Sequence, residues 1–190
     1  MKKQYADFSS ITELENWLIT NSINLAVWNS NQAKSVEHLF QEIVTGESYI
    51  QITPPLRVVQ VVQVLVPKGD KFLLELGQEL EDQRKRQRHA PPSEKMKPGE
   101  DCFMTAIRCL VEELEVAQEN IQIETERCEP CVRYRHSQSY PGLRTQYVVY
   151  QVKASVSGLP PDNFTTKEIS HDGKHDLVRA HYWGWGRVKI

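Results

Sequence analysis

The sequence has no long hydrophobic run and no apolar segment near its N-terminus. Its longest apolar stretch, Val58 to Val66, is interrupted by Gln60 and Gln63. It is much shorter than the ~20 apolar residues that a membrane helix needs. Two lysines stand at the N-terminus, but no apolar segment follows them, so we expect no signal peptide. These absences predict a cytoplasmic protein that does not enter a membrane.

The sequence is also poor in cysteine and has little net charge. Four cysteines in 190 residues, with no secretory signal, predict reduced thiols rather than a disulfide framework. The chain has 23 Lys and Arg against 25 Asp and Glu, a formal net charge of −2. A charge this small gives the whole molecule no attraction for nucleic acid or an anionic membrane. Any anion site must therefore come from a local cluster.

What the sequence contains is sufficient for one folded domain with a short extension. A chain of this length buries ~70% of its unfolded surface when it folds. Capping residues and apolar spacing predict one helix over residues 10–20 and a second helix after Ser35. We therefore expect a helical N-terminal extension over residues 1–52, followed by a domain over residues 53–190.

The second domain alternates strand and helix patterns. A β-branched run predicts a buried strand at residues 57–66, with residues 71–76 as its hairpin partner. Residues 77–99 form a polar loop, and a helix is expected at residues 101–115. The expected buried face of this helix comprises Phe103, Ile107, Leu110 and Leu114. Later strands are expected at residues 121–125, 132–136 and 145–153 and in the C-terminal aromatic segment. This order predicts an α+β fold with a mixed sheet.

Residues 94–116 carry the clearest chemical motif. They resemble the signature of the Nudix hydrolase family, G-x5-E-x7-R-E-U-x-E-E-x-G-U, in which U is aliphatic. Six of the nine fixed positions agree: Glu100, Arg108, Leu110, Glu112, Glu113 and Val116. Three positions depart from the signature: Glu94 replaces the first glycine, Cys109 replaces the glutamate after the arginine, and Glu115 replaces the last glycine.

The resemblance implies an αβα sandwich that hydrolyses a nucleotide-like or other phosphorylated diphosphate with Mg²⁺ or Mn²⁺. It implies that Glu112 and Glu113 are metal ligands. It also implies that Arg108 braces the loop at Glu100 against the helix. Such a cation would neutralise oxyanion charge and supply an activated water.

The residue at position 109 leaves the activity open. At 100° per residue, positions 109, 112 and 113 share one face of a helix, so three acids there would surround a cation. Cys109 is instead a neutral, soft ligand that suits Mg²⁺ badly. Two hypotheses follow: a hydrolase of weakened activity, or a non-catalytic module that binds a ligand or a protein. In the second, the N-terminal helices would contact a partner or form a homodimer.

A basic run precedes the motif and is the candidate substrate contact. Its cations are Arg84, Lys85, Arg86 and Arg88. Arginine binds phosphate oxygens in a bidentate manner, so the run can hold a diphosphate, or it can be a solvated loop that balances nearby acids. The run argues against nucleic acid as a partner, because it has no interleaved aromatic residues.

Two other clusters invite a metal interpretation. Cys128 and Cys131 form a CxxC, but Cys102 and Cys109 are spaced along a helix, so we favour ordinary thiols over a zinc or redox site. The second cluster comprises His171, Asp172, His175, Asp176 and His181, and the turn residues within it favour a solvated loop.

Two C-terminal features have no firm role. Glu168 is a late acid of the kind that completes some sites in the resembled family. Tyr182, Trp183 and Trp185 are more typical of core or interface packing than of a base-stacking site.

Overall fold

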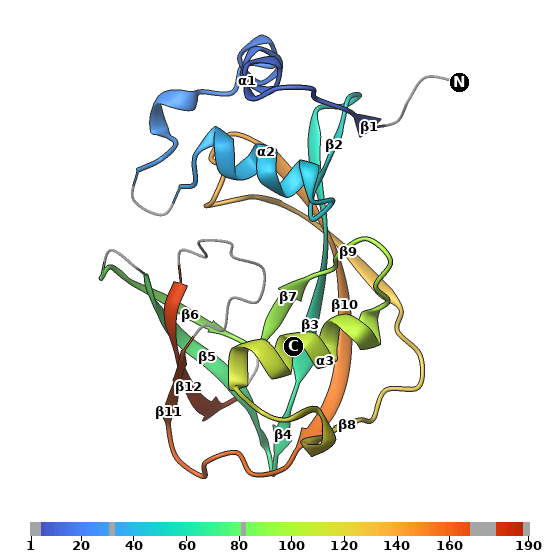
Figure 1. Ribbon diagram of the computed structural model, residues 1–190, viewed down its shortest axis with the longest axis vertical. Coiled ribbons are helices and arrows are strands. Elements are labelled where there is room, and N and C mark those ends of the chain that lie inside the picture. Colours follow the sequence, from blue (N-terminus) through green and yellow to red (C-terminus); the bar gives the residue numbers. More distant parts are fainter. Residues whose placement is uncertain (1–4, 31–32, 81–82, 168–177, 188–190) are drawn as a thin grey trace. The chain divides into compact units, whose positions relative to one another are not determined.

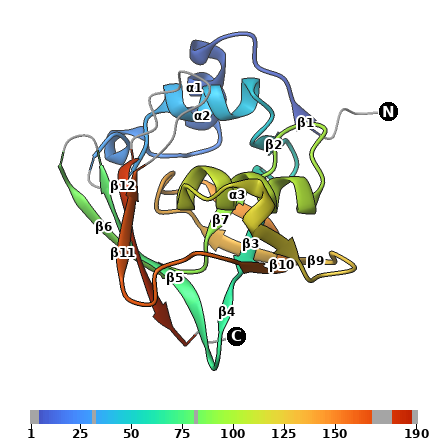
Figure 2. The same cartoon turned by 60° about the horizontal axis from the view of Figure 1, so that its bottom comes forward.

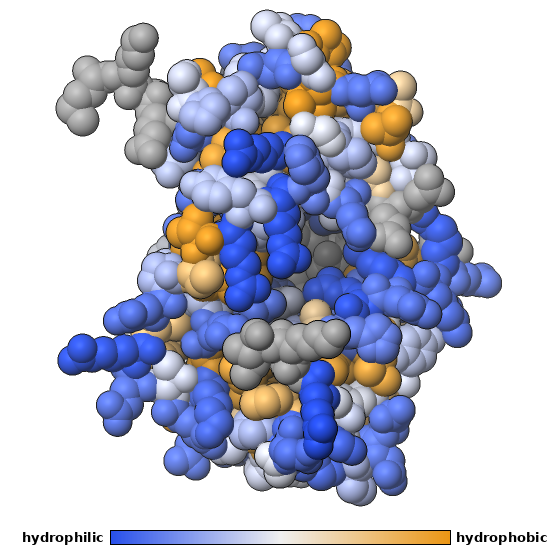
Figure 3. All heavy atoms as spheres, turned by 180° about the vertical axis from the view of Figure 1, so that it is seen from behind, coloured by the Kyte–Doolittle hydropathy of each residue, from blue (hydrophilic) through white to orange (hydrophobic). Residues whose placement is uncertain are grey.

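The computed structural model describes residues 5–30, 33–80, 83–167 and 178–187 (Figure 1). The chain divides into two compact units. Unit 1 comprises residues 1–61, 95–99 and 130–149, and unit 2 comprises residues 62–94, 100–129 and 150–190. No helix in the described part of the chain is long and apolar enough to cross a membrane. Figure 3 shows a mostly hydrophilic face with hydrophobic side chains in small groups.

Unit 1 contains the two helices expected near the N-terminus. Ser10 Oγ accepts from the backbone N–H of Glu13 at the start of the first helix, and Ser35 Oγ accepts from that of His38 in the second. These hydrogen bonds satisfy donors that a helix N-terminus leaves free. The elements that lie wholly or partly in unit 1 are β1 (Tyr5–Ala6), α1 (Ile11–Thr20), the 3₁₀ helix η1 (Leu25–Val27), α2 (Val36–Val44), β2 (Tyr49–Gln51), β3 (Leu56–Leu65), β9 (Pro130–His136) and β10 (Arg144–Val156).

The core of unit 1 joins the helices to a distant turn. Leu14 and Leu18 of α1 and Leu39 of α2 are fully buried with Tyr140 and Leu143. Figures 1 and 2 both show α1 and α2 side by side. The motif at residues 140–144, whose role the sequence left open, therefore belongs to this core. A domain boundary at residue 52 stays a prediction.

A buried charge network fixes α2 to β3. Glu42 accepts hydrogen bonds from Arg57 at 2.5 Å, from Ser48 at 2.8 Å and from Lys95 at 2.6 Å. Lys34 adds a contact at 3.2 Å. Burial alone would raise the pKa of Glu42, but the charges of Arg57 and the two lysines together hold it well below its usual value.

Unit 2 is built on a five-stranded sheet and one long helix. The strand order is β11-β12-β5-β4, and β6 also pairs with β5; Figure 2 gives a second view of these strands. The C-terminal parts of β3 and β10 also lie in unit 2. The further elements wholly or partly in unit 2 are β4 (Pro67–Lys68), β5 (Lys71–Leu80), β6 (Lys85–Ala90), β7 (Ser93–Lys95), α3 (Cys102–Leu114), the 3₁₀ helix η2 (Gln118–Asn120), β8 (Ile121–Ile123), β11 (Phe164–Lys167) and β12 (Val178–Gly186).

The polar segment at residues 77–99 is not a loop, as the sequence predicted. It continues β5 to Leu80 and then forms β6 and β7. Hydrogen bonding to the neighbouring strand outweighs the low β-propensity of its charged residues. The expected hairpin also differs, because β5 pairs with the two-residue strand β4 and not with β3.

Helix α3 lies where the sequence predicts a helix, but its buried face is rotated. Leu110 and Leu114 are buried as expected, whereas Phe103 and Ile107 are only half-buried. The buried positions are instead Cys102, Thr105, Ala106, Cys109, Leu110, Glu113 and Leu114. A strictly apolar count misses this face, because it includes a threonine, two cysteines and a carboxyl. The expected α+β class is confirmed.

Candidate active site

The first part of the site is an ion-pair network on α3. Arg108 Nε and Nη2 donate to the two carboxylate oxygens of Glu100 at 2.7 and 2.9 Å. Arg108 Nη1 donates to Glu112 at 3.2 Å and lies 3.7 Å from Glu94. Burial alone would lower the pKa of Arg108, but the bonds to Glu100 and the nearby acids raise it. The guanidinium therefore stays charged and links three carboxylates.

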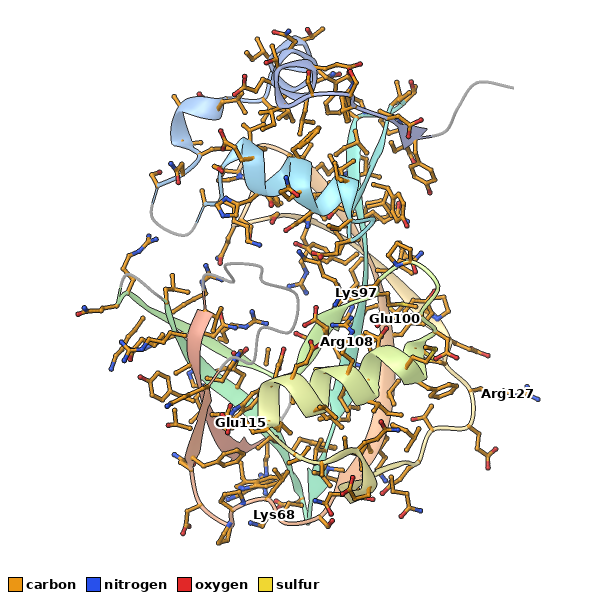
Figure 4. All side chains as sticks on the ribbon, in the orientation of Figure 1. Lys68, Lys97, Glu100, Arg108, Glu115 and Arg127 are labelled. Atoms are coloured by element: carbon orange, nitrogen blue, oxygen red, sulfur yellow. The ribbon has the colours of Figure 1, made fainter. Side chains whose placement is uncertain are left out.

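The local fold explains why these groups meet. Gly99 has φ of 85°, a left-handed conformation that favours glycine, and the chain turns there just before Glu100. Asp101 then caps α3 by accepting from the backbone N–H groups of Phe103 and Met104. Figure 4 shows Glu100 near one end of α3 and Glu115 at the other, with Arg108 between them.

The second part of the site is buried beneath the helix. Glu113 is 7% exposed, and its Oε2 atom has no hydrogen-bond partner. Burial and the neighbouring acids Glu75 and Glu94 raise its pKa well above the usual value. Cys109 is fully buried, and its burial likewise raises the pKa of the thiol. Cys109 and Glu113 thus point inward, whereas Glu112 is half-buried and bound to Arg108.

A carboxylate and imidazole pair, which the sequence patterns did not indicate, lies near Glu113. Glu75 of β5 contacts His181 Nδ1 at 2.6 Å and Arg88 Nε at 2.8 Å, and both Glu75 and His181 are 2% exposed. The assignment of His181 to a solvated loop is therefore wrong, since it lies buried on β12. The available signal was a single glutamate within the apolar strand KFLLEL.

A bulge in β5 orients these side chains. Leu76 is an extra residue between Glu75 and Gly77 in the pairing with both β12 and β6. Such an insertion shifts the alternation of the strand, so Glu75 and Gln78 face the same side. A Cβ atom at Gly77 would lie 2.7 Å from the carbonyl oxygen of Arg86, which requires glycine there.

The basic run forms strand β6, which divides its cations between two faces. Arg84 and Lys85 are exposed, and Lys85 lies 5.4 Å from the ring centroid of Tyr182. Arg86 and Arg88 are half-buried, and Arg88 contacts Glu75. Gln78 Oε1 and Arg86 Nε are buried without a hydrogen-bond partner.

Gln78 and Arg86 lie directly opposite each other across β5 and β6. Their two unpartnered atoms occupy the side of the sheet that also carries Glu75.

The described residues provide two carboxylates for a cation. Across these residues, no group of three or more His, Cys, Asp or Glu side chains is arranged to hold a metal ion. Mg²⁺ commonly uses only one or two carboxylates, with water and substrate phosphates as its other ligands. The unpartnered oxygen of Glu113 and the half-buried carboxylate of Glu112 fit that pattern.

The other candidate clusters contribute no metal site. All four cysteines are free thiols. Burial and a hydrogen bond with Cys102 raise the pKa of Cys128 to about 12, which makes it a poor nucleophile. His171, Asp172, His175, Asp176 and Glu168 lie outside the described residues. Trp183 is fully buried and donates to Thr166, so it belongs to the core of unit 2.

Comparison with known proteins finds similar structures only. No family model and no curated protein matches the chain. The chain is similar to a NUDIX hydrolase from Nitrosomonas europaea, with 17% identity over 66% of this chain and 71% of that one and a TM-score of 0.40. It is similar to the C. elegans Ap4A hydrolase, with 22% identity over 68% and 80% and a TM-score of 0.33. It is also similar to the E. coli ORF135 protein, with 17% identity over 68% and 74% and a TM-score of 0.38.

Solved Nudix hydrolases are thus among the structures similar to this chain, as the motif predicts. Because the TM-scores are low, we infer function from the chain's own residues.

Proposed function

We propose that this chain is a Nudix-type hydrolase of a nucleotide-like or other phosphorylated diphosphate, with activity weakened by Cys109. One observation carries the proposal. Arg108 joins Glu100 to Glu112 by hydrogen bonds, one turn of helix before the unpartnered carboxyl oxygen of Glu113. A solvated acidic helix face would not require a half-buried arginine between two carboxylates or a buried acid without a partner.

Each residue has a distinct part in the proposed reaction. Glu112 and Glu113 would hold Mg²⁺ or Mn²⁺, which when bound neutralises developing oxyanion charge and lowers the pKa of a water. Arg108 keeps Glu112 oriented and fixes the turn at Glu100. Glu75 holds Arg88 and His181 in fixed positions near Glu113. Together these groups orient a diphosphate and exclude water from the buried side.

The substrate contact is assigned to the basic strand β6. Arg86 and Arg88 lie on the same side as Glu75, so their guanidinium groups are the ones that would bind phosphate oxygens. Arg84 and Lys85 are exposed at the start of β6 and would attract the anion as it approaches. A nucleotide-like diphosphate offers both the charge and further polar groups for Gln78.

A non-catalytic module is the second candidate. It is favoured by the neutral, buried thiol of Cys109 at a position where the resembled signature has an acid. In this case the site would bind a phosphorylated ligand without cleaving it. Ile19 of α1 and Val44 of α2 are 60% and 61% exposed, so they are the apolar residues through which the N-terminal helices would contact a partner protein or a second copy.

Turnover separates the two candidates. The purified chain is incubated with a panel of nucleoside diphosphate compounds and dinucleoside polyphosphates, with Mg²⁺, with Mn²⁺ or with EDTA. We expect slow, cation-dependent release of phosphorylated products, abolished by EDTA. Saturable binding of a panel member without any turnover would instead establish the non-catalytic module.

A further inference from the structure

Strand β9 in unit 1 has an unusual surface. All seven of its residues are exposed, including Val132 at 48% and Tyr134 at 54%. Among the described residues it pairs only with β10, so its outer edge carries unpaired backbone groups. A strand that buries none of its side chains contributes little to a core. Its residue types therefore call for another explanation.

The hairpin that contains β9 is strongly basic. Residues 130–149 include Arg133, Arg135 and Arg144 and contain no aspartate or glutamate. Within the described part of the chain, Arg133 and Arg135 form no ion pair. Unit 1 as a whole has nine Lys and Arg against six Asp and Glu, although the complete chain has a net charge of −2. The positive charge is therefore local and exposed.

An exposed aromatic ring lies among these arginines. The guanidinium carbon of Arg144 lies 5.2 Å from the ring centroid of Tyr134, a cation–π contact that orients both groups. Strand alternation places Val132, Tyr134 and His136 on one side of β9, with Arg133 and Arg135 on the other. The ring thus has cations on both sides and one face available for stacking.

We propose that the β9–β10 hairpin binds single-stranded nucleic acid. Bases would stack on Tyr134, and the phosphates that pass over the edge of β9 would contact Arg133, Arg135 and Arg144. Aromatic rings between arginines are the combination that recognises single strands, because every base has a π-face and every nucleotide a charge. The expectation that nucleic acid is not a partner rested on the run at residues 84–88, which lacks this combination.

Two alternatives use fewer of these features. Arginines on an edge strand can simply prevent association of edges, but that role gives no use to an exposed tyrosine held by Arg144. An acidic protein would satisfy the charges but not the ring. The proposal does not depend on the hydrolase activity, since the hairpin lies in unit 1 and the residues of the proposed active site lie in unit 2.

Fluorescence anisotropy with labelled twelve-nucleotide strands of oligo(dT) and oligo(U) tests the proposal. EDTA is included so that metal-dependent hydrolysis does not contribute. We expect binding that weakens with salt, and Arg133→Gln combined with Arg135→Gln should reduce the slope of log K against log salt by about 1.4, at ~0.7 per phosphate contact. Tyr134→Ala should weaken binding ~5- to 150-fold, and Tyr134→Phe should retain it.

Matched controls separate this site from general charge effects. Lys71→Gln with Lys167→Gln removes two exposed cations from unit 2 and should leave affinity unchanged, and circular dichroism confirms that each variant is folded. The proposal is wrong if the wild-type chain does not bind, or if both Tyr134 variants bind alike in a folded protein. It is equally wrong if polyglutamate displaces the strands as well as unlabelled oligo(dT) of equal charge does.

Discussion

Cys109 and Glu113 form a buried pair whose chemistry depends on one missing charge. Both side chains are buried beneath α3, and Glu75 and Glu94 act electrostatically on both of them. A neutral thiol adds no repulsion to these acids, which stabilises the protein without a cation. The same thiol supplies no third carboxylate for a cation. The substitution therefore favours the empty state of the site over the loaded one.

Cys109→Glu should reverse this preference. We expect the variant to bind Mg²⁺ or Mn²⁺ more tightly and to have higher diphosphohydrolase activity. It should also be less stable than the wild-type chain without metal and regain stability with it, because the added carboxylate is repelled by its neighbours. Calorimetry and thermal unfolding with and without metal measure both effects. The control is Cys109→Gln, which has similar size and no charge, and equal metal affinity in the two folded variants would refute the explanation.

Glu115 is a second departure from the motif with a measurable cost. It ends α3 with φ of 55° and ψ of 32°, the left-handed conformation that costs a residue with a Cβ about 1–2 kcal/mol relative to glycine. Its carboxylate accepts from the backbone N–H of Lys167 at 2.5 Å. Glu115→Gly and Glu115→Ala both remove this bond, but only glycine relieves the backbone. Urea unfolding should show the glycine variant to be more stable by about 1 kcal/mol, and equal stabilities would contradict this account.

At the scale of elements, the network around Glu42 should make unit 1 sensitive to acid. Because the pKa of Glu42 is lower in the folded than in the unfolded protein, its stabilisation is present above pH ~4.3 and is lost as the pH falls further. Glu42→Gln leaves Arg57 without its anion and should cost about 3–5 kcal/mol near pH 7.

The matched control for this test is Glu37→Gln, an exposed position on the same helix. Denaturant unfolding of both variants near pH 7 and near pH 3 is the measurement. Glu42→Gln should lose much of its difference from the wild-type protein at the lower pH. A difference that is the same at both pH values would show that the charge of Glu42 is not what stabilises α2.

Elements with a regular apolar period could be predicted from sequence, and elements that depend on distant pairing could not. α1, α2, α3, β3, β10 and β12 all follow local patterns. β6 is a strand because β5 offers a hydrogen-bonded edge, and no property of the charged sequence itself indicates this. β1 and β11 are short for the same reason: each depends on one neighbour, Tyr49–Gln51 or Val178–Gly186.

The candidate site shows the same division. Glu100, Arg108, Glu112 and Glu113 could be found because they share one segment with fixed spacing. Glu75 and His181 are 106 residues apart, and only the pairing of β5 with β12 brings them together. Residues gathered from separate strands leave no periodic signal in the sequence.

At the scale of the whole molecule, the N-terminal helices are needed for the fold of unit 1. Tyr140 and Leu143 are fully buried in the same core as Leu14, Leu18 and Leu39. Removing residues 1–52 would expose these side chains, at a cost of ~1.5–3 kcal/mol for each large one. We therefore expect residues 53–190 alone to unfold less cooperatively or to aggregate, as judged by light scattering and denaturant unfolding. A monomeric fragment with a cooperative transition like that of the whole chain would contradict this.

The central claim is that the buried carboxyl of Glu113 takes part in hydrolysis of a diphosphate, and Glu113→Gln tests it most directly. The amide has nearly the same shape and cannot provide a carboxylate to a cation, so kcat on the best substrate of the panel should fall ~10²- to 10³-fold. Glu119→Gln, at an exposed acid outside the site, should leave kcat unchanged. A folded Glu113→Gln protein that retains full cation-dependent turnover would place the chemistry elsewhere and contradict the account.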